Sequence, residues 1–509
     1  MEECFPRGGG PRVKSEVDGE ASQSLAESTE VRRLNKKKKW DSDQSDDDCG
    51  GMQPKSGKRQ KQENAPESEG VWVDRLRESL CSNELVVLAC ISRIRDDRIE
   101  LDLPDSLRGF VPGSDFDLGS DVSLDQVFKT GQMLCCRVVN ESPTSRHHQS
   151  NLCLTTNPQS TNSSLANVTL CPGMILNVRV RSQQDKGYLV DTGLSNVRGF
   201  MPFTAEQKTL SPGQSLLVRI SQVKSEGRAI HCEQLSAKNK SKLPLQLDDQ
   251  ALETLQHDEL LPGTVINAQV DKVTHNGVLV TLAKGVRGFV HRCHLPAKYR
   301  LDLGSLSATV QLAVVVTYTQ ARSTMLGLSA QTRTWALHDC DARRNVGDFS
   351  VGDILNCRVQ NVSKKGNVRF ELATNANDDG TNTDSTKKIR EHCAIVASRK
   401  DLELPSDADS TMIATRYPLT SAHKARVIRI DTFDRQILVS CRACAIKAKF
   451  VSAEQASAGE RVKCTVERVL PTGVLCSING VVRAIVPMLH AADKPPGTET
   501  KLKAMFSEG

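Results

Sequence analysis

The sequence predicts an all-β protein made of several copies of one small barrel. Three observations predict this fold class: strand-like alternation of apolar residues, glycines at recurring places, and a repeated Arg-Gly-Phe triplet. The triplets begin at Arg108, Arg198 and Arg287, so successive copies lie 90 and 89 residues apart. Such a repeat is longer than the roughly 20–50 residues of a solenoid unit. It has the size of a small independent domain.

The copy at 261–295 shows the pattern most clearly and contains three short strands. Thr264–Val273 is β-branched and alternating, Gly277–Leu282 is almost wholly apolar, and Val286–Val290 carries the triplet. A strand period fits these runs and a helical period does not. Gly187, Gly277 and Gly473 recur where a strand has to bend at a barrel corner.

Each triplet is followed by a linker and two further strands. The fourth strands are predicted at 132–139, 214–220, 309–316 and 424–430, and the fifth at 151–155, 228–232, 325–329 and 436–440. Five short strands with glycines at fixed places describe a closed barrel of the OB type.

These elements divide the chain into six segments. We expect a disordered charged tail at 1–70, barrels at 76–156, 170–234 and 260–330, a divergent barrel with a polar insertion at 350–442, and a truncated barrel at 457–509. The third strand of the divergent barrel is expected at His392–Val396, without the triplet. The last barrel is expected to lack its fourth and fifth strands.

The tail is poor in apolar residues and has 13 Lys/Arg against 15 Asp/Glu, which leaves a net charge of +8 on the barrels. Such a segment cannot bury enough apolar surface to fold. Two basic clusters around an acidic spacer predict a nuclear import signal, made of Arg32, Arg33, Lys36, Lys37, Lys38, Lys39, Lys58, Arg59 and Lys61. A solubilising charged tail is the alternative.

The pattern PGxVxxxVxxVxxxGxxVxL, followed by RGFV and a GQxLxVRV strand, resembles the S-one repeat, an RNA-binding OB barrel. The resemblance covers residue 76 to the C-terminus. A lysine-rich tail before tandem divergent barrels is similar to the N-terminal half of ribosomal-RNA-processing proteins of the programmed cell death protein eleven family. This resemblance implies a noncatalytic, nucleolar assembly factor whose partners are pre-ribosomal RNA and factors that assemble the small and large subunits. It implies no cofactor, no membrane and no small-molecule substrate.

In an OB barrel, the face of strands two and three binds single-stranded nucleic acid, where aromatic rings stack on bases and cationic side chains meet phosphates. The residues at these places are Arg108, Phe110, Lys186, Tyr188, Arg198, Phe200, His275, Arg287, Phe289, His291 and Arg483. For the three phenylalanines we favour a place in the barrel core, because apolar side chains alternate inward along strands. For the arginines, contact with RNA or protein and a merely solvated side chain remain equal alternatives.

No catalytic motif stands out, so we expect no enzyme. The 17 cysteines are scattered, and Cys441 and Cys444 form a CxxC pair without a partner pair. His291, Cys293 and His294 look like metal ligands, but strand alternation places His294 opposite His291, so we expect no metal.

Two classes of function remain: an RNA-binding assembly factor, and a protein-interaction scaffold whose barrels have lost contact with RNA. The scaffold is suggested by the scarcity of rings, 12 Phe, 4 Tyr and 3 Trp in the whole chain. A cytoplasmic, translation-associated RNA binder is disfavoured by the import signal in the tail.

Overall fold

The computed structural model describes the barrel region of the chain with several gaps. The described residues are 85–119, 121–139, 152–166, 170–203, 210–224, 228–234, 257–274, 276–282, 286–301, 303–320, 325–331, 349–363, 366–373, 394–405, 409–492 and 498–507. The expected tail and import signal lie outside these residues, as does the expected polar insertion. None of the described helices is long and apolar enough to cross a membrane.

The first barrel follows the strand order β1-β2-β3-β5-β4 and is closed by antiparallel pairing of β1 with β4. The only parallel contact within this ring joins β3 to β5. Its strands are β1 (Leu85–Ile94), β2 (Arg98–Asp102), β3 (Arg108–Pro112), β4 (Met133–Val138) and β5 (Leu152–Thr155). This is the predicted five-stranded OB arrangement.

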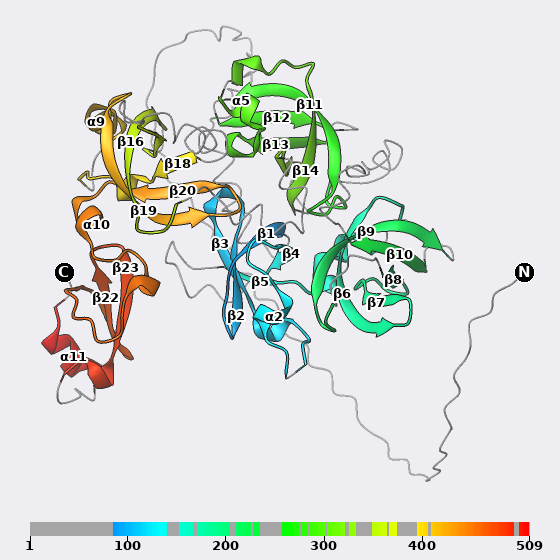
Figure 1. Ribbon diagram of the computed structural model, residues 1–509, viewed down its shortest axis with the longest axis horizontal. Helices are drawn as coiled ribbons and strands as arrows, with labels where there is room; N and C mark the ends of the chain where they lie inside the picture. The colour runs from blue at the N-terminus through cyan, green and yellow to red at the C-terminus, as the bar shows by residue number, and fades with distance from the viewer. Residues whose placement is uncertain are drawn as a thin grey trace, which may run out of the picture. The chain divides into compact units, whose positions relative to one another are not determined.

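The second and fourth barrels are separate closed sheets with the same order. Figure 1 shows the second barrel, with β6 to β10 curled around a common interior. The strands of the second barrel are β6 (Ile175–Gln184), β7 (Gly187–Asp191), β8 (Arg198–Pro202), β9 (Ser215–Lys224) and β10 (Ala229–Gln234). Those of the fourth are β16 (Ile354–Val362), β17 (Val368–Leu372), β18 (Ala394–Ala397), β19 (Ala422–Asp431) and β20 (Gln436–Ser440).

The third barrel is closed by pairing of β11 with β14 and is also joined to the first barrel. Its strands are β11 (Val265–Thr274), β12 (Gly277–Thr281), β13 (Arg287–His291), β14 (Gln311–Gln320) and β15 (Met325–Ser329). The end of β14 extends beyond its own barrel and pairs with the start of β1, so the two barrels share one ten-stranded sheet.

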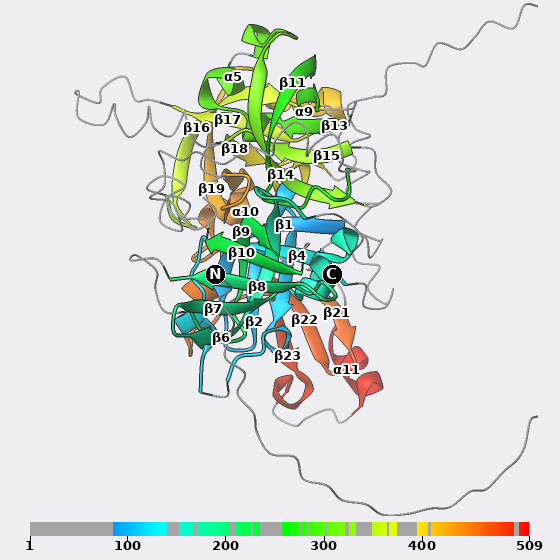
Figure 2. The same ribbon diagram turned by 90° about the vertical axis from the view of Figure 1, so that its right-hand side faces the viewer.

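The described part of the fifth repeat is a three-stranded sheet of β21 (Thr465–Leu470), β22 (Gly473–Ile478) and β23 (Val482–Pro487). α11 (Glu499–Met505) lies beside this sheet in both views (Figures 1 and 2). Leu502 of α11 packs with Val469, Val474 and Cys476. The sequence did not predict this helix.

Short helices connect the strands and add little to the cores. The α-helices are α2 (Leu124–Val127), α3 (Pro158–Thr161), α5 (Ala297–Leu301), α9 (Ser410–Arg416) and α10 (Ala443–Lys447). A 3₁₀ turn follows the third strand in the first, third, fourth and fifth repeats, as in η6 (Arg292–His294) after β13.

The barrels are packed against one another through a turn of the fourth barrel. Phe433, between β19 and β20, is 5% exposed and packs among residues of the first and second barrels, including Leu88, Cys135 and Leu217. Arg429 of β19 donates to Asp102 of β2 at 2.8 Å. The repeat length predicts small independent domains, but these contacts and the β1–β14 pairing join the first four barrels to one another.

Candidate nucleic-acid interface

The third strand of three barrels presents the same outer face. In β3, β8 and β13 the arginine of the triplet is exposed, the glycine is buried, and the phenylalanine is half-buried. The buried residue that follows each phenylalanine, Val111, Met201 or Val290, belongs to the core instead. Our interpretation of Phe110, Phe200 and Phe289 as core residues was therefore wrong.

The physical reason is the two-residue period of a strand, which puts the glycine and the residue after the phenylalanine on one side. Space on that side is taken by neighbouring side chains. A Cβ on Gly288 would lie 2.2 Å from Leu328 Cδ1, and one on Gly199 would lie 2.5 Å from Val190 Cγ2. The phenylalanine and arginine consequently share the outer face.

In the second barrel, this face carries a small aromatic patch. Phe200 lies beside Leu189 of β7 and beside His231 of β10, with 5.6 Å between the Phe200 and His231 ring centroids. Burial, and after it the charge of Lys224, lowers the pKa of His231, so its ring is neutral at physiological pH. Arg198 stands two residues from Phe200 and opposite Asp191.

In the third barrel, Phe289 occupies the same register. It faces Leu279 of β12, and its ring centroid lies 6.4 Å from that of His291. Arg287 lies opposite Thr281, which adds no negative charge to the face.

In the first barrel, the neighbour of the phenylalanine is cationic. The Arg98 guanidinium lies 5.6 Å from the Phe110 ring centroid, within the range of a cation–π contact. Arg98 comes from β2, and its Nη2 also lies 3.7 Å from Glu100. Arg108 is exposed at the start of β3, opposite Asp102.

Three other predicted contact residues lie elsewhere, and one is not described. Tyr188 is 2% exposed and accepts a hydrogen bond from the Leu210 amide at 3.1 Å, so this ring fills the core of the second barrel and is closed to a base. Lys186 is exposed in the turn before β7. Arg483, in the fifth repeat, forms an ion pair with Glu467 at 3.0 Å. His275 lies outside the described residues.

The fourth barrel lacks this surface. Arg369 of its second strand lies opposite Val396 of its third strand, and the phenylalanine of the second strand, Phe370, is 3% exposed in the core. The absence of the triplet in the sequence is thus matched by the absence of an outer aromatic side chain on β18.

Three residues near the interface were not among the predicted contact residues. Arg98 and His231 come from the second and fifth strands, and Phe203 follows β8 with 41% of its surface exposed. Parallel pairing of the third and fifth strands in an OB barrel was the signal that could have indicated His231, which lies opposite Phe200.

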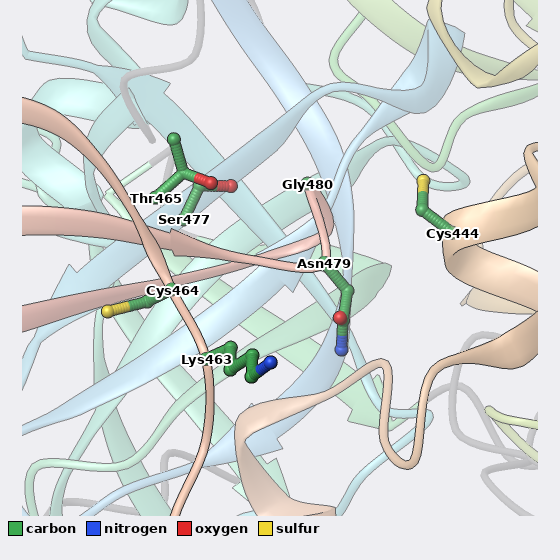
Figure 3. A pocket seen from close by; sticks show the side chains of 7 residues that line it. All are labelled: Cys444, Lys463, Cys464, Thr465, Ser477, Asn479 and Gly480. Carbon is green, nitrogen blue, oxygen red and sulfur yellow. The ribbon is translucent and has the colours of Figure 1, made fainter. Parts of the chain in front are cut away.

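A shallow pocket of about 340 Å³ lies in the C-terminal part of the chain, away from these faces (Figure 3). It is lined by Cys444, Lys463, Cys464, Thr465, Ser477, Asn479 and Gly480. Cys444 and Cys464 stand at opposite sides of it in Figure 3, and Cys441, the other half of the CxxC pair, is buried. The pocket shows no convergence of catalytic groups.

Comparison with known proteins places these barrels in context. No family model matches the chain. It is 26% identical over 558 aligned positions to the Protein RRP5 homolog of Mus musculus, covering all of this chain and 27% of that protein. The Protein RRP5 homolog of Homo sapiens is 26% identical over 97% of this chain and 26% of its own length. The rRNA biogenesis protein RRP5 of Arabidopsis thaliana is 23% identical over 84% of this chain and 24% of its own length.

The chain is thus similar to the RRP5 proteins over nearly its whole length. It spans about a quarter of the length of these RRP5 relatives. A solved multidomain protein with nucleic acid binding domains from Streptococcus pneumoniae aligns with 50% of this chain and 74% of its own, at 16% identity and a TM-score of 0.13. A score this low carries no structural argument beside the RRP5 matches.

Proposed function

We propose that the chain is a noncatalytic RNA-binding assembly factor that holds single-stranded pre-ribosomal RNA during ribosome biogenesis. The observation that carries this proposal is the outer face shared by β3, β8 and β13, where an exposed arginine stands two residues from a half-buried phenylalanine. The names of the RRP5 relatives, which include rRNA biogenesis protein, supply the class of RNA.

The chemistry of this face suits a single strand. A half-buried ring stacks on a base with little sequence preference, which contributes about 1–3 kcal/mol per base. The neighbouring arginine adds a phosphate contact. The three faces lie on barrels that contact one another. An RNA strand bound to one face therefore meets the next face at a high effective concentration, and the three weak contacts together raise its affinity.

Fluorescence anisotropy with the full chain and a labelled single-stranded RNA tests the proposal. The logarithm of the association constant should fall linearly with the logarithm of the salt concentration, because each phosphate contact releases counterions. The double variant Arg198→Ala/Phe200→Ala should bind at least about 5-fold more weakly, the lower limit of one lost stacking contact. Unchanged affinity of this variant at every salt concentration would contradict the proposal.

Two control variants separate the barrel face from other cations. Arg358→Ala removes an exposed arginine of β16 in the barrel without the aromatic face, and it should bind like the unaltered chain. Replacement of Lys36–Lys39 by alanine removes a basic cluster of the tail and should leave the contribution of Phe200 unchanged.

The proposal also includes a nucleolar location and the partners that go with it, the small- and large-subunit assembly factors. Ultraviolet crosslinking in the cells that make this protein, followed by sequencing of the attached RNA, should recover pre-ribosomal RNA. Recovery of messenger RNA alone would favour the translation-associated alternative.

A second function, as a protein-binding scaffold, is favoured for the fourth barrel. This barrel lacks the aromatic face, and its β19–β20 turn is already used to contact other barrels through Phe433 and Arg429. If RNA binding survives only in the first three barrels, the fourth serves assembly rather than recognition.

A further inference from the structure

We propose that Cys293, His294 and Asp434 bind a zinc ion that joins the third barrel to the fourth, with His291 in contact with the Cys293 thiol. The ligand atoms of Cys293, His294 and Asp434 all lie within 4.8 Å of one another. The three residues are 4%, 5% and 2% exposed. Thiolate, imidazole and carboxylate together form a donor set typical of Zn²⁺.

The local backbone explains how these ligands converge. β13 ends at His291, and Arg292–His294 forms the 3₁₀ turn η6. Strand alternation, which predicted that His294 would face away from His291, therefore stops before His294. The turn brings both His291 and His294 to Cys293, and His291 Nδ1 lies 2.8 Å from Cys293 Sγ.

The remaining ligand comes from a distant part of the chain. Asp434 lies in the turn between β19 and β20, 140 residues after His294, and its Oδ1 lies 2.9 Å from His294 Nε2. In a tetrahedral zinc site, neighbouring nitrogen and oxygen ligands are about 3.3 Å apart. A small separation of these two side chains would therefore admit the ion between them.

Neighbouring hydrogen bonds hold the ligands in orientations that suit a metal. His294 Nδ1 lies 3.1 Å from Ser329 Oγ, which leaves Nε2 directed to Asp434. The Ser106 amide donates to Asp434 Oδ2 at 2.7 Å, so that Oδ1 is left for the ion. The Phe433 ring packs against the His294 ring with 5.6 Å between centroids. Partners of this kind fix the ring and carboxylate orientation in known metal sites.

Zn²⁺ would bind Cys293 as the thiolate and His294 as the neutral imidazole. Because Ser106 belongs to the first barrel, the ion would lie at a junction to which three barrels contribute.

Titration of the full chain with Co²⁺ after removal of bound metal tests the site. Cobalt in a tetrahedral thiolate site gives visible d–d bands and a thiolate-to-cobalt charge-transfer band, and Zn²⁺ bleaches both. We expect one equivalent of Co²⁺ to produce these bands. Their absence in the unaltered chain would overturn the proposal.

Variants assign the ligands. Cys293→Ser should abolish the charge-transfer band. Asp434→Asn keeps an oxygen acceptor for the Ser106 amide and should weaken Co²⁺ binding at least about 10-fold, because loss of even a partner outside the ligand shell costs about that much. Cys444→Ser, which alters an exposed cysteine at the C-terminal pocket, is the matched control and should retain both bands. If Cys293→Ser is folded and keeps the charge-transfer band, the assignment is wrong.

A second measurement tests the joining of the barrels. Zn²⁺ that binds the folded chain should raise its melting temperature by mass action. This increase should be present in the unaltered chain and in Cys444→Ser, and it should be lost in Asp434→Asn. An equal increase in all three proteins would show that zinc acts elsewhere. RNA binding is not part of either readout, so this proposal and the proposed function fail independently.

Discussion

At the scale of single residues, the junction of the first and fourth barrels depends on how three buried carboxylates are neutralised. Asp102 accepts hydrogen bonds on both oxygens, from Arg429 at 2.8 Å and from the amide and hydroxyl of Thr432 at 3.1 and 2.9 Å. Asp431 accepts two amide hydrogen bonds on Oδ1, while its Oδ2 lies 3.5 Å from Arg429. Arg429 thus pairs with Asp102 and Asp431, while Asp434 contacts the Ser106 amide and His294.

This arrangement predicts that Asp431 makes the junction sensitive to pH. Burial first, and then repulsion from Asp434 and Asp102, raises the pKa of Asp431 well above its ordinary value. The folded chain therefore holds this proton to a higher pH than the unfolded chain does. The contribution of Asp431 to stability is greatest below the ordinary aspartate pKa of about 4 and declines as the pH rises through the folded pKa.

Asp431→Asn should remove that decline, because the amide keeps the Oδ1 acceptor and carries no charge. We expect its melting temperature at neutral pH to exceed that of the unaltered chain and the difference to shrink as the pH is lowered towards 4. Scanning calorimetry of the two proteins from pH 7 to pH 4 measures the melting temperatures and how their difference changes with pH. A lower melting temperature of the variant at neutral pH would show that the Asp431 charge stabilises the junction.

At the scale of elements, the sequence predicted the strands well and their outer faces poorly. The predicted fifth strands 325–329 and 436–440 agree with β15 and β20 residue for residue, because each is a short apolar run between clear turns. The third strand was located correctly, but the phenylalanine was assigned to the core because apolar side chains alternate inward, and the wrong set of alternate residues was chosen. The glycine two residues before Val111, Met201 or Val290 already indicated which side faces inward.

Other parts of the candidate site depended on long-range pairing that no local pattern contains. Tyr188 is the exception, because its ring shares the inward side of β7 with Val190, as strand alternation requires. His231 reaches Phe200 only because the third and fifth strands pair in parallel, across 31 residues of sequence.

The glycine that begins the second strand in β7, β12 and β22 gives a prediction for the barrel as an element. A Cβ on Gly277 would lie 2.2 Å from the backbone oxygen of Val290 in the facing strand, which cannot move without breaking the β12–β13 ladder. Gly277→Ala should therefore destabilise the third barrel by about 1–3 kcal/mol, the usual cost of overpacking.

Gly119→Ala is the matched control, because no atom lies within 4 Å of its added Cβ. Chemical denaturation of both variants measures the difference. Equal stability of Gly277→Ala and Gly119→Ala would mean that the close approach of β13 is not needed for the barrel to close.

At the scale of the whole molecule, the described barrels form a packed assembly. Repetition in the sequence predicted how many barrels there are but not how they meet, because contacts such as β1 with β14, or Arg429 with Asp102, join residues more than 200 positions apart. No periodic pattern marks these residues. The contact of Phe433 with the other barrels could not be predicted either, because a single aromatic residue in a turn does not indicate which surface it packs against.

The Arg429–Asp102 pair predicts how firmly the fourth barrel is held. Asp102 is 2% exposed, so Arg429→Ala leaves a buried carboxylate without its cation, at a cost of about 3–5 kcal/mol. Hydrogen exchange should then accelerate at the Thr432 and Ser106 amides, which bond to Asp102 and Asp434. Adding Asp102→Asn to Arg429→Ala should recover part of the lost stability, because the buried carboxylate that Arg429 had neutralised is then no longer charged.

Arg416→Ala is the control for this experiment, because Arg416 is exposed at the end of α9 in the same barrel. It should leave exchange at both amides unchanged. If Arg429→Ala also leaves them unchanged, the first and fourth barrels are not held together through Asp102.

We propose that RNA binds the outer face of the third strand in the first three barrels. Photocrosslinking of the full chain to 4-thiouridine RNA, followed by mass spectrometry of the attached peptides, tests it most directly. We predict adducts on peptides that contain Phe110, Phe200 and Phe289, with loss of the second on Phe200→Ala. Adducts confined to the tail or to the fourth barrel would contradict the claim.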